Sequence, residues 1–398
     1  MRAIPSFCGM YLINTKDICS GKWQIVIISP EMILSKRFVT NVLRNPEMRT
    51  RVLSVVVDEA HVVSHWGSGF RKKYGTLGVL RALLPKDTPM VAMSATLPDR
   101  VQRDVLKKLQ FDEKKYTYLN LGNDRPNVSL VVRAIQNTLG SYTDLDFLIP
   151  RGVHEASEVK KTFIYSDNIS VGSDMMEHLY EIGPESFREA GIIRTYSSAF
   201  SAKYRREVME LFKAGVVRIL ICTDAAGMVG CRYKIPLSAW IDILIHQGCN
   251  IPDIDIVVQW KLPATVSSFV QRAGRAARKK GRTGLAVLLV EKPAYEVDLT
   301  EVQNQNDGRS KKRKGNVREP TSYPKTKDKN YALNRGVLRG AFGGATDKIP
   351  AQIDVPLDRF SMDEGLHSLV QTTKCRRQVL TAIYGNAPPR ECIPRILS

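Results

Sequence analysis

Short apolar runs alternate with polar or amphipathic stretches over the first three quarters of the chain. Each run places apolar residues at consecutive positions, which is typical of strands buried on both faces. The runs occupy residues 23–29, 53–59, 89–96, 161–167, 191–198, 217–224, 253–260 and 284–291. Helical patterns lie between several of them, such as residues 201–215, which begin with a Ser cap and end with Gly. This alternation predicts α/β domains built on parallel sheets.

Turn residues and charge divide the chain into four parts. The turn-rich segment Gly122–Ser129 predicts a boundary between a first domain, residues 1–125, and a second domain, residues 126–298. Residues 299–340 are polar and basic, which predicts a disordered linker. Residues 341–398 predict a short helical tail.

The charge balance narrows the class of partner. Of 398 residues, 59 are Lys or Arg and 40 are Asp or Glu, so the formal net charge is +19. This excess favours a polyanionic partner, nucleic acid ahead of a membrane surface, although a basic tail on a neutral core would also produce it. The tetrapeptide KKRK at Lys311–Lys314 is either a nuclear-import signal or part of a plain linker.

Apolar run lengths, the N-terminal sequence and the cysteine spacing indicate the cellular compartment. No apolar run reaches the roughly 20 residues that cross a bilayer, and the N-terminus lacks a signal-peptide pattern. The 7 cysteines contain no C-x-x-C pair and are scattered within apolar sequence. We therefore expect a soluble protein in a reducing intracellular compartment.

Two acids, Asp58 and Glu59, end the apolar run in VVVDEAH. A carboxylate at the C-terminal end of a parallel strand points into the crevice where ligands bind. There Asp58 can hold Mg²⁺ through water, and Glu59 can position and deprotonate a water that attacks a γ-phosphate. The alternative is a pair of helix N-cap residues.

The loop that follows interleaves aromatic and basic side chains. It contains His65, Trp66, Phe70, Arg71 and Tyr74 in a segment with several Gly. Because bases stack on aromatic rings and phosphates pair with Arg or Lys, this composition suits single-stranded nucleic acid. The alternative is a loop folded onto the core by its aromatic rings.

A second basic motif, QRAGRAARKKGRTG, begins at Gln271. Gln271, Gly274, Arg275 and Arg278 are spaced to share one face of a helix. Two guanidiniums on one face match a phosphoryl group that gains charge during transfer. The alternative is a basic surface helix without a ligand.

Together these motifs resemble the RecQ family of DNA helicases. The matching segments are VVVDEAH, SHWGSGFRKKY, MSATL, FIYSD, ILICTDAAGM and QRAGRAAR, in the family's order. The resemblance covers residues 22–295, and more weakly residues 365–392. It implies an α/β fold of two RecA-like parallel-sheet domains of the P-loop NTPase class. It also implies an ATP- and Mg²⁺-dependent 3′-to-5′ DNA helicase of the nucleus, active on single-stranded or partly duplex DNA in repair or recombination.

The resemblance also implies a role for each motif residue. In the first domain, Asp58 and Glu59 would bind Mg²⁺ and activate water. The residues that would couple DNA contact to ATP hydrolysis are Trp66, Phe70, Arg71, Ser94 and Thr96. In the second domain, Thr223, Asp224 and Gly227 would lie between DNA and nucleotide. Arg275 and Arg278 would act as arginine fingers supported by Gln271.

The sequence departs from the family at the phosphate-binding loop. The pattern G-x-x-x-x-G-K-[ST] is absent from the chain. The only near match, Gly21–Lys22, has Trp23 in place of Ser or Thr and precedes an apolar run, whereas a phosphate loop follows one. We therefore expect an incomplete first domain. Two hypotheses follow: an ATP-dependent helicase, or a catalytically inactive nucleic-acid-binding remnant.

Two further departures lie downstream. Residues 229–247 interrupt the motif that begins CTDAAGM, as either a genuine loop or a retained intron translated in frame. Residues 126–298 without that insert are expected to fold alone. Near the C-terminus, Cys375 resembles the first ligand of the family's zinc subdomain, with Cys392 as a second. Two thiols do not complete a tetrahedral site, so zinc is doubtful.

Overall fold

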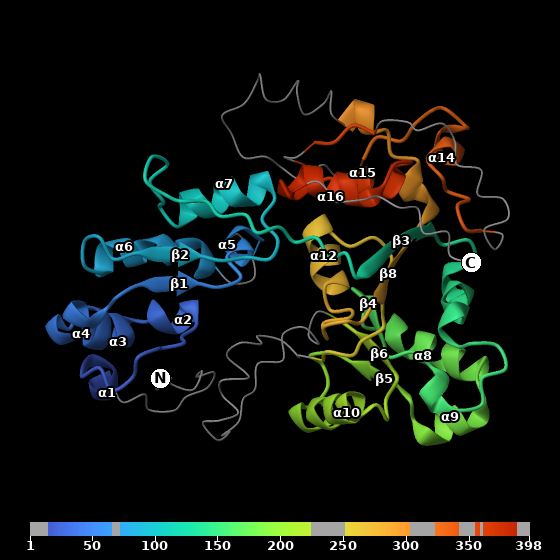
Figure 1. The fold of residues 1–398 in the computed structure, drawn as a ribbon, viewed down its shortest axis with the longest axis horizontal. Coiled ribbons are helices and arrows are strands. Elements are labelled where there is room, and N and C mark those ends of the chain that lie inside the picture. Colours follow the sequence, from blue (N-terminus) through green and yellow to red (C-terminus); the bar gives the residue numbers. More distant parts are fainter. Residues whose placement is uncertain are drawn as a thin grey trace. The chain divides into compact units, whose positions relative to one another are not determined.

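The computed structural model describes residues 15–65, 72–223, 251–302, 323–341, 355–358 and 361–387. The described residues form two compact units, one reaching to Leu121 and the other beginning at Gly122. Figure 1 colours the first unit blue to teal and the second green to red. The insert predicted at residues 229–247 lies outside the described residues. In the described part of the chain, no helix is both long and apolar enough to span a membrane.

The first unit packs short helices around a two-stranded parallel ribbon. The strands are β1 (Val55–Val57) and β2 (Met90–Ala92), with Val55 opposite Met90 and Val57 opposite Ala92. The α-helices are α1 (Thr15–Cys19), α2 (Pro30–Ile33), α3 (Lys36–Phe38), α4 (Pro46–Arg51), α5 (His61–His65), α6 (Leu80–Leu83) and α7 (Asp99–Lys108). A π-helical turn, η1 (Val39–Leu43), and a 3₁₀ helix, η2 (Tyr74–Val79), complete the unit.

Local sequence explains where some of these helices begin. Ser29 accepts a hydrogen bond from the Met32 N–H, and Asn45 accepts from the N–H groups of Glu47 and Met48. Both caps are followed by a Pro at the first helical position, where its missing N–H costs nothing.

The prediction of a strand at residues 23–29 is wrong. This segment has no strand beyond an isolated bridge at Ile25. Instead, Trp23, Val26 and Ile28 pack against the helical core as partly buried side chains. The ribbon also differs from the expected strands buried on both faces, because the paired residues Val56 and Val91 are 53% and 44% exposed.

The second unit is built on a six-stranded sheet whose order is β3-β8-β7-β4-β6-β5, with every neighbouring pair parallel. The strands are β3 (Val128–Ala134), β4 (Thr162–Ser166), β5 (Ile193–Tyr196), β6 (Ile219–Cys222), β7 (Ile256–Trp260) and β8 (Gly284–Val290). All except β3 fall within predicted apolar runs. β3 escaped prediction because Ser129 and Arg133 interrupt its apolar positions and it begins inside the turn-rich segment. The parallel α/β fold is confirmed.

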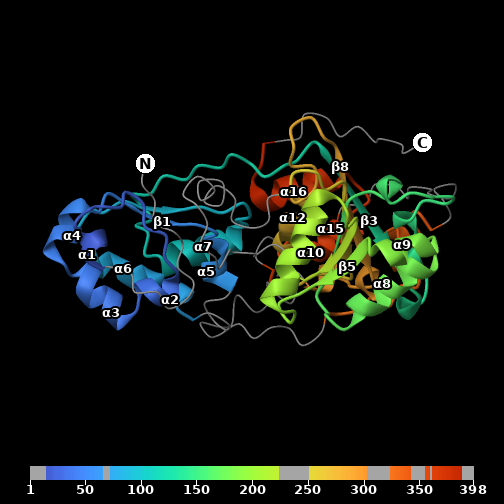
Figure 2. The same ribbon diagram turned by 90° about the horizontal axis from the view of Figure 1, so that it is seen from below.

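Helices cover both faces of this sheet. The α-helices α10 (Ala202–Ala214) and α12 (Val266–Ala273) lie on one face, and α8 (Val171–Glu181) and α9 (Glu185–Ala190) lie on the other (Figure 2). Alternate residues of each strand serve the two layers: Phe163 faces the first layer and its neighbour Ile164 the second. The 3₁₀ helices are η3 (Leu139–Ser141), η4 (Thr143–Leu148), η5 (Ala156–Glu158) and η7 (Lys292–Tyr295).

The C-terminal helices pack into the core of the second unit. These are α14 (Tyr331–Asn334), α15 (Leu366–Gln371) and α16 (Arg376–Tyr384). Six of their residues are buried in one cluster with residues of β3, β8 and α12: Leu366, Leu369, Val370, Leu380, Ile383 and Tyr384. The tail that the sequence analysis separated from the second domain therefore shares that domain's hydrophobic core.

The predicted disorder of residues 299–340 does not hold for their described C-terminal part. Lys325 forms an antiparallel bridge with Val297, and the Thr326 N–H donates to the Glu296 carbonyl at 2.9 Å. Val337 is buried in the shared core. These few long-range contacts order a polar segment whose composition alone indicates disorder. Residues 303–322 lie outside the described residues.

Buried polar residues anchor the tail to α12. The Glu364 side chain, fully buried, accepts a hydrogen bond from the Ser267 N–H in the first turn of α12 at 3.0 Å. Tyr384 Oη lies 3.1 Å from Ser267 Oγ. Asp363 Oδ2 lies 2.7 Å from His367 Nδ1, and the His367 ring packs against Tyr323. Burial raises the pKa of Asp363, but hydrogen bonds from His367 and Ser361 outweigh it and lower that pKa to about 2.

Replacing Asp363 with Asn should therefore lower the free energy of unfolding by roughly 2 kcal/mol near pH 7. A carboxyl with a depressed folded-state pKa stabilises above its unfolded pKa, and this contribution disappears as the pH falls from about 4 to about 2. Urea unfolding of both proteins across this range measures the gap. Glu189→Gln, at an exposed acid of α9, is the control. A gap that stays constant down to pH 2 would contradict the assignment.

Candidate functional site

The two predicted acids lie at the carboxyl end of β1. Asp58 and Glu59 form the turn between β1 and α5, and Asp58 Oδ1 accepts from the Glu59 N–H at 2.9 Å. Glu59 has a φ of 48°, an uncommon left-handed conformation for a non-glycine residue. The Ala60 N–H donates to the Met93 carbonyl at 2.8 Å, and the Met93 N–H donates to Val57 at 2.9 Å. The turn is thus held beside the segment that follows β2.

His61 connects this turn to the MSATL segment. Its Nδ1 lies 3.0 Å from Ser94 Oγ and 3.3 Å from Glu59 Oε2. Ser94 Oγ donates to the Thr96 carbonyl at 2.9 Å and accepts from the Thr96 N–H at 3.1 Å. Because the Ser94 hydroxyl has only one proton and donates it to Thr96, we assign the His61 proton to Nδ1. Glu59, His61, Ser94 and Thr96 therefore form one hydrogen-bonded group.

The sequence analysis assigned no role to His61, although it assigned Ser94 and Thr96 to the coupling of DNA contact and ATP hydrolysis. The His61 side chain is 9% exposed. A buried imidazole between the acid pair and a serine joins the ends of two neighbouring parallel strands. The sequence signal for His61 was its position as the last residue of the D-E-A-H motif.

The donor set of this turn is compatible with a Mg²⁺–nucleotide. Both carboxylates are solvent-accessible: the Glu59 side chain is 47% exposed, and Asp58 is also exposed. Mg²⁺ is typically bound by one or two carboxylates together with water and substrate phosphates, and a full cage of protein ligands is not required. Within the described ranges no group of three or more His, Cys, Asp or Glu side chains could hold a metal ion. Asp58 and Glu59 would contribute the protein oxygens. Trp66, Phe70 and Arg71 lie outside the described residues.

The carboxyl edge of the second sheet carries the other predicted residues. Thr223 directly follows β6, and its N–H donates to the Tyr196 carbonyl at 3.3 Å. Gln271 lies in the last turn of α12. Asp224 and Gly227 lie outside the described residues.

The prediction that Gln271, Gly274, Arg275 and Arg278 share one helical face is wrong. α12 ends at Ala273, and residues 274–277 form a turn in which Ala277 has a φ of 45°. Ala276 and Ala277 are buried, and a Cβ at Gly284 would lie only 3.0 Å from either methyl group. The Ala277 N–H bonds to the Ile254 carbonyl at 2.8 Å, which no helix could provide. Tertiary packing against β8 therefore ends the helix early.

Arg125 holds this turn and was missed by the sequence analysis. Its guanidinium donates to the carbonyls of Gly274, Ala276 and Ala277 at 3.0–3.1 Å. Asn127 Nδ2 adds a bond to the Ala277 carbonyl at 3.0 Å. These carbonyls have no N–H partner of a continuing helix, and the Arg125 guanidinium, which is distant in sequence, donates hydrogen bonds to them instead. Arg125 thereby supports the backbone that carries Arg275 and Arg278.

Arg272 is a second residue that sequence reasoning missed. It is 5% exposed, forms an ion pair with Asp167 Oδ1 at 2.6 Å, and donates to Gln259 Oε1. Its guanidinium also lies 5.3 Å from the centre of the Tyr165 ring. These contacts tie α12 to the carboxyl ends of β4 and β7.

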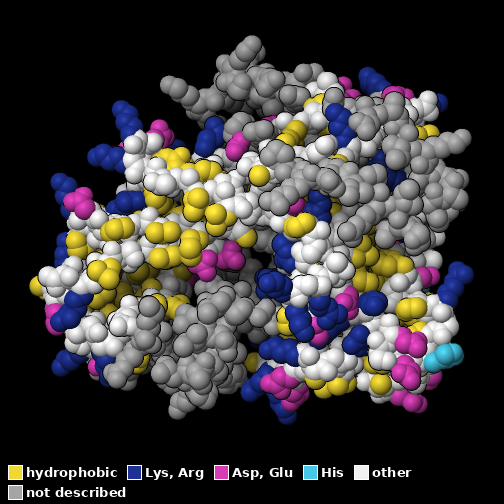
Figure 3. Space-filling view, viewed as in Figure 1, with side chains coloured by type: hydrophobic (Ala, Val, Ile, Leu, Met, Phe, Trp, Pro, Cys, Tyr) yellow, Lys and Arg dark blue, Asp and Glu magenta, His cyan; other side chains and the backbone are white. Residues whose placement is uncertain are grey.

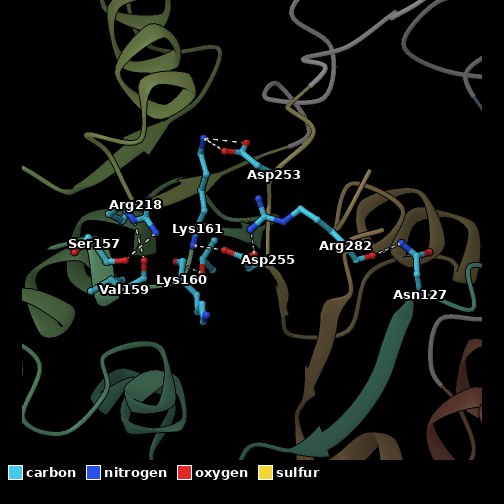
Figure 4. Close-up of polar contacts among 10 residues, drawn as sticks. Asn127, Ser157, Val159, Lys160, Lys161, Arg218, Asp253, Asp255 and Arg282 are labelled. Carbon is cyan, nitrogen blue, oxygen red and sulfur yellow. Dashed lines mark hydrogen bonds and ion pairs between the residues drawn. The ribbon is translucent and has the colours of Figure 1, made fainter. Parts of the chain in front are cut away.

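A separate polar cluster occupies the amino edge of the same sheet (Figure 4). Lys161, 2% exposed, places its Nζ 3.0 Å from both Asp253 oxygens and 3.2 Å from the Lys213 carbonyl. Nearby, Arg282 pairs with Asp255 at 2.7 Å. Ligands of open parallel sheets bind at the carboxyl edge, so we interpret this cluster as an anchor for the chain that enters β7.

Cys375, the candidate zinc ligand, lies at the N-cap of α16 and is partly exposed. Cys392 lies outside the described residues. A zinc site at Cys375 would need ligands beyond those that the structure describes.

Basic side chains are prominent on one face of the second unit. In the space-filling view, Lys and Arg gather over β4, β5 and β6, with acidic side chains among them (Figure 3). This distribution agrees with a polyanionic partner.

Two family models match the chain. The DEAD/DEAH box helicase model matches residues 11–105, and the helicase conserved C-terminal domain model matches residues 143–280. The first model includes the Asp58–Ser94 group, and the second includes α12 and the turn after it.

Curated relatives and solved structures agree with these models. The ATP-dependent DNA helicase RecQ of Haemophilus influenzae is 26% identical over 66% of this chain and 35% of that protein. The bifunctional 3′-5′ exonuclease/ATP-dependent helicase WRN of Mus musculus is 27% identical over 66% of this chain and 16% of that protein. The DNA-bound DUF1998 helicase MrfA matches the fold with a TM-score of 0.50 and 15% identity, covering 86% of this chain and 44% of that one.

The chain thus spans only about a third or less of the length of these curated relatives. The motif residues, the parallel sheets and both helicase models agree with one another. The chain therefore carries a DEAD/DEAH box helicase domain and a helicase conserved C-terminal domain, and the curated relatives it resembles include RecQ-family helicases.

Proposed function

We propose that this chain provides motor-domain residues of a RecQ-type, ATP-dependent 3′-to-5′ DNA helicase. The observation that carries this proposal is the hydrogen-bonded group at the ends of β1 and β2, in which His61 links Glu59 to Ser94 and Thr96. Such a link lets a change at the hydrolytic carboxylate reach a segment assigned to DNA coupling.

Each residue then has a chemical role. Bound Mg²⁺–ATP would supply the phosphoryl group and a metal that neutralises its charge. Asp58 would hold the metal through water, and Glu59 would take a proton from the attacking water. Asp224 and Gly227 would contact the nucleotide. In the second unit, Arg275 and Arg278 would stabilise charge that develops during transfer, with Gln271 beside them.

The second candidate function is nucleic-acid binding without ATP turnover. The absence of G-x-x-x-x-G-K-[ST] from the sequence favours it, since that loop supplies backbone amides and a lysine to the phosphates. For the 398-residue chain tested by itself, we therefore expect negligible ATP hydrolysis, with or without DNA. Turnover like that of an intact helicase, abolished by Glu59→Gln, would contradict this expectation.

Binding of single-stranded DNA should persist without ATP. We expect a labelled dT20 oligonucleotide to bind more weakly at 200 mM than at 50 mM NaCl, because bound phosphates release counterions. Trp66→Ala should weaken binding by roughly tenfold through lost base stacking, and Arg71→Ala should reduce the salt dependence. Fluorescence anisotropy measures both effects, with Arg188→Ala on α9 as the control. Affinity that responds to neither salt nor these substitutions would exclude this mode of binding.

A further inference from the structure

Three arginines from distant parts of the sequence contact neighbouring backbone segments near the first turn of α16. Arg133 lies on β3, Arg339 follows α14, and Arg376 is the first residue of α16. Arg339 and Arg376 are close enough for their charges to repel each other. Burial raises the pKa of Tyr295, and the positive charges of both arginines oppose that rise. Arg133 donates to the carbonyl of Gly340, the residue next to Arg339.

These guanidiniums have few partners. Arg339 Nη1 donates to the Thr372 carbonyl and Arg376 Nη2 to the Val132 carbonyl, each at a long 3.5 Å. Each guanidinium carries about five N–H donors, so most of them are unused. Arg339 Nη2 and Arg376 Nε are shielded from solvent and have no hydrogen-bond partner among the residues that the structure describes. A partly buried donor left in this way is costly.

No carboxylate within the described ranges neutralises this cluster. Four other arginines of the same unit pair with an acid: Arg188 with Glu177, Arg272 with Asp167, Arg282 with Asp255 and Arg377 with Asp124. Arg133, Arg339 and Arg376 form no such pair. Among the described residues, the groups that bond to these three guanidiniums are backbone carbonyls.

The start of α16 adds to the positive potential. The helix has 9 residues, and its N-cap, Cys375, makes no side-chain hydrogen bond to the first turn. The N-terminal N–H groups of a helix and its dipole favour an anion. Arg376 begins this helix, so the guanidinium cluster and the helix terminus lie together.

We infer that Arg133, Arg339 and Arg376 bind a phosphoryl group, with the backbone of single-stranded DNA as its source. A phosphoryl group offers several oxygen acceptors that match forked guanidinium donors, and the net charge of +19 favours a polyanion over a single carboxylate. This site goes beyond the proposed motor function, because it requires neither ATP nor the residues around Glu59.

Inorganic phosphate is the first probe. Thermal unfolding of the full chain is compared in sodium phosphate and in sodium chloride at equal pH and ionic strength. At a phosphate concentration tenfold above its Kd, the Tm should rise by about 4 °C. The shift should disappear in Arg339→Gln and Arg376→Gln but persist in Arg188→Gln, which removes a charge from α9.

Single-stranded DNA is the second probe. Each phosphate contact contributes about 0.7 to the magnitude of the slope of log K against log salt, so R339Q/R376Q should reduce that magnitude by about 1.4. Arg188→Gln should leave the slope unchanged. A weaker salt dependence in R339Q/R376Q supports the DNA backbone as the source. A lost phosphate shift with an unchanged slope supports a phosphoryl site filled by free phosphate.

Equal phosphate shifts in all variants, together with unchanged slopes, would overturn the inference. If the glutamine variants fail to fold, Arg339→Lys and Arg376→Lys retain the charge but lose the fork, and the phosphate shift should fall by about half. Full shifts in both lysine variants would also overturn it. None of these readouts depends on ATP hydrolysis, so failure here and failure of the proposed helicase are distinguishable.

Discussion

Deleting residues 355–398 should unfold the second unit, leaving no intact sheet. The deletion removes α15 and α16, whose apolar side chains are buried in the same cluster as β3 and β8. Burying one Leu, Ile or Val contributes about 1.5–3 kcal/mol. Loss of Leu366, Leu369, Val370, Leu380 and Ile383 therefore removes roughly 10 kcal/mol, comparable to the whole stability of a domain.

Polar losses act in the same direction. The deletion leaves the Ser267 N–H without Glu364 and exposes the face of α12 that the tail covers. Circular dichroism and amide hydrogen exchange of the full and shortened chains would measure the effect. Deleting only residues 388–398 is the matched control. A shortened chain whose β4, β6 and β7 amides remain fully protected would contradict this prediction.

The same reasoning revises the expectation for residues 126–298 without 229–247. That segment contains the six strands but lacks the helices that cover part of their core. We now expect it to aggregate or to bind a hydrophobic dye. Extending it to residue 387, and starting it at Gly122, should restore a cooperative thermal transition.

Replacing Arg125 with Ala should destabilise the second unit by about 3 kcal/mol. Three carbonyls lose a charged donor at once, and a hydrogen bond to a charged group contributes about 1.5–3 kcal/mol. Water can reach part of this turn, which is why the expected cost is below the full sum. Arg275 and Arg278 lie on the released backbone, so their positions should also become less defined.

Two variants separate this role from a loss of charge. Arg125→Lys keeps one cation but cannot reach three carbonyls, and we expect it to recover less than half of the lost stability. Arg188→Ala removes a solvent-accessible, ion-paired arginine and should cost far less stability than Arg125→Ala. Urea unfolding measures all three. An Arg125→Ala protein as stable as Arg188→Ala would show that the turn does not depend on this guanidinium.

Hydrophobic patterning alone predicts the strands that lie in the interior of the second sheet. Strands such as β4, β6 and β7 are buried on both faces, so each appears as a largely apolar run. The same pattern located Asp58, Glu59, Ser94 and Thr96, because polar residues that closely follow a parallel strand lie at the carboxyl edge of its sheet. These inferences need only neighbours in sequence, and their residue roles stay predictions.

Long-range contacts determine which apolar segments pair as strands. Residues 23–29 have the composition of a strand but pack against helices, whereas β3 pairs with β8 despite its polar interruptions. Strand pairing depends on a partner far away in the chain, and composition does not record that partner.

The same limit applies to the end of α12, to the tail and to Arg125. Helical spacing continues through Arg278, yet the helix ends at Ala273 because the next turn packs against β8, and Arg125, 149 residues from Gly274, bonds to the carbonyl groups of that turn. The apolar residues of the tail join it to the core where they pack with β3 and β8. The periodicity of a segment indicates which of its residues are buried. Long-range packing determines which other residues they contact.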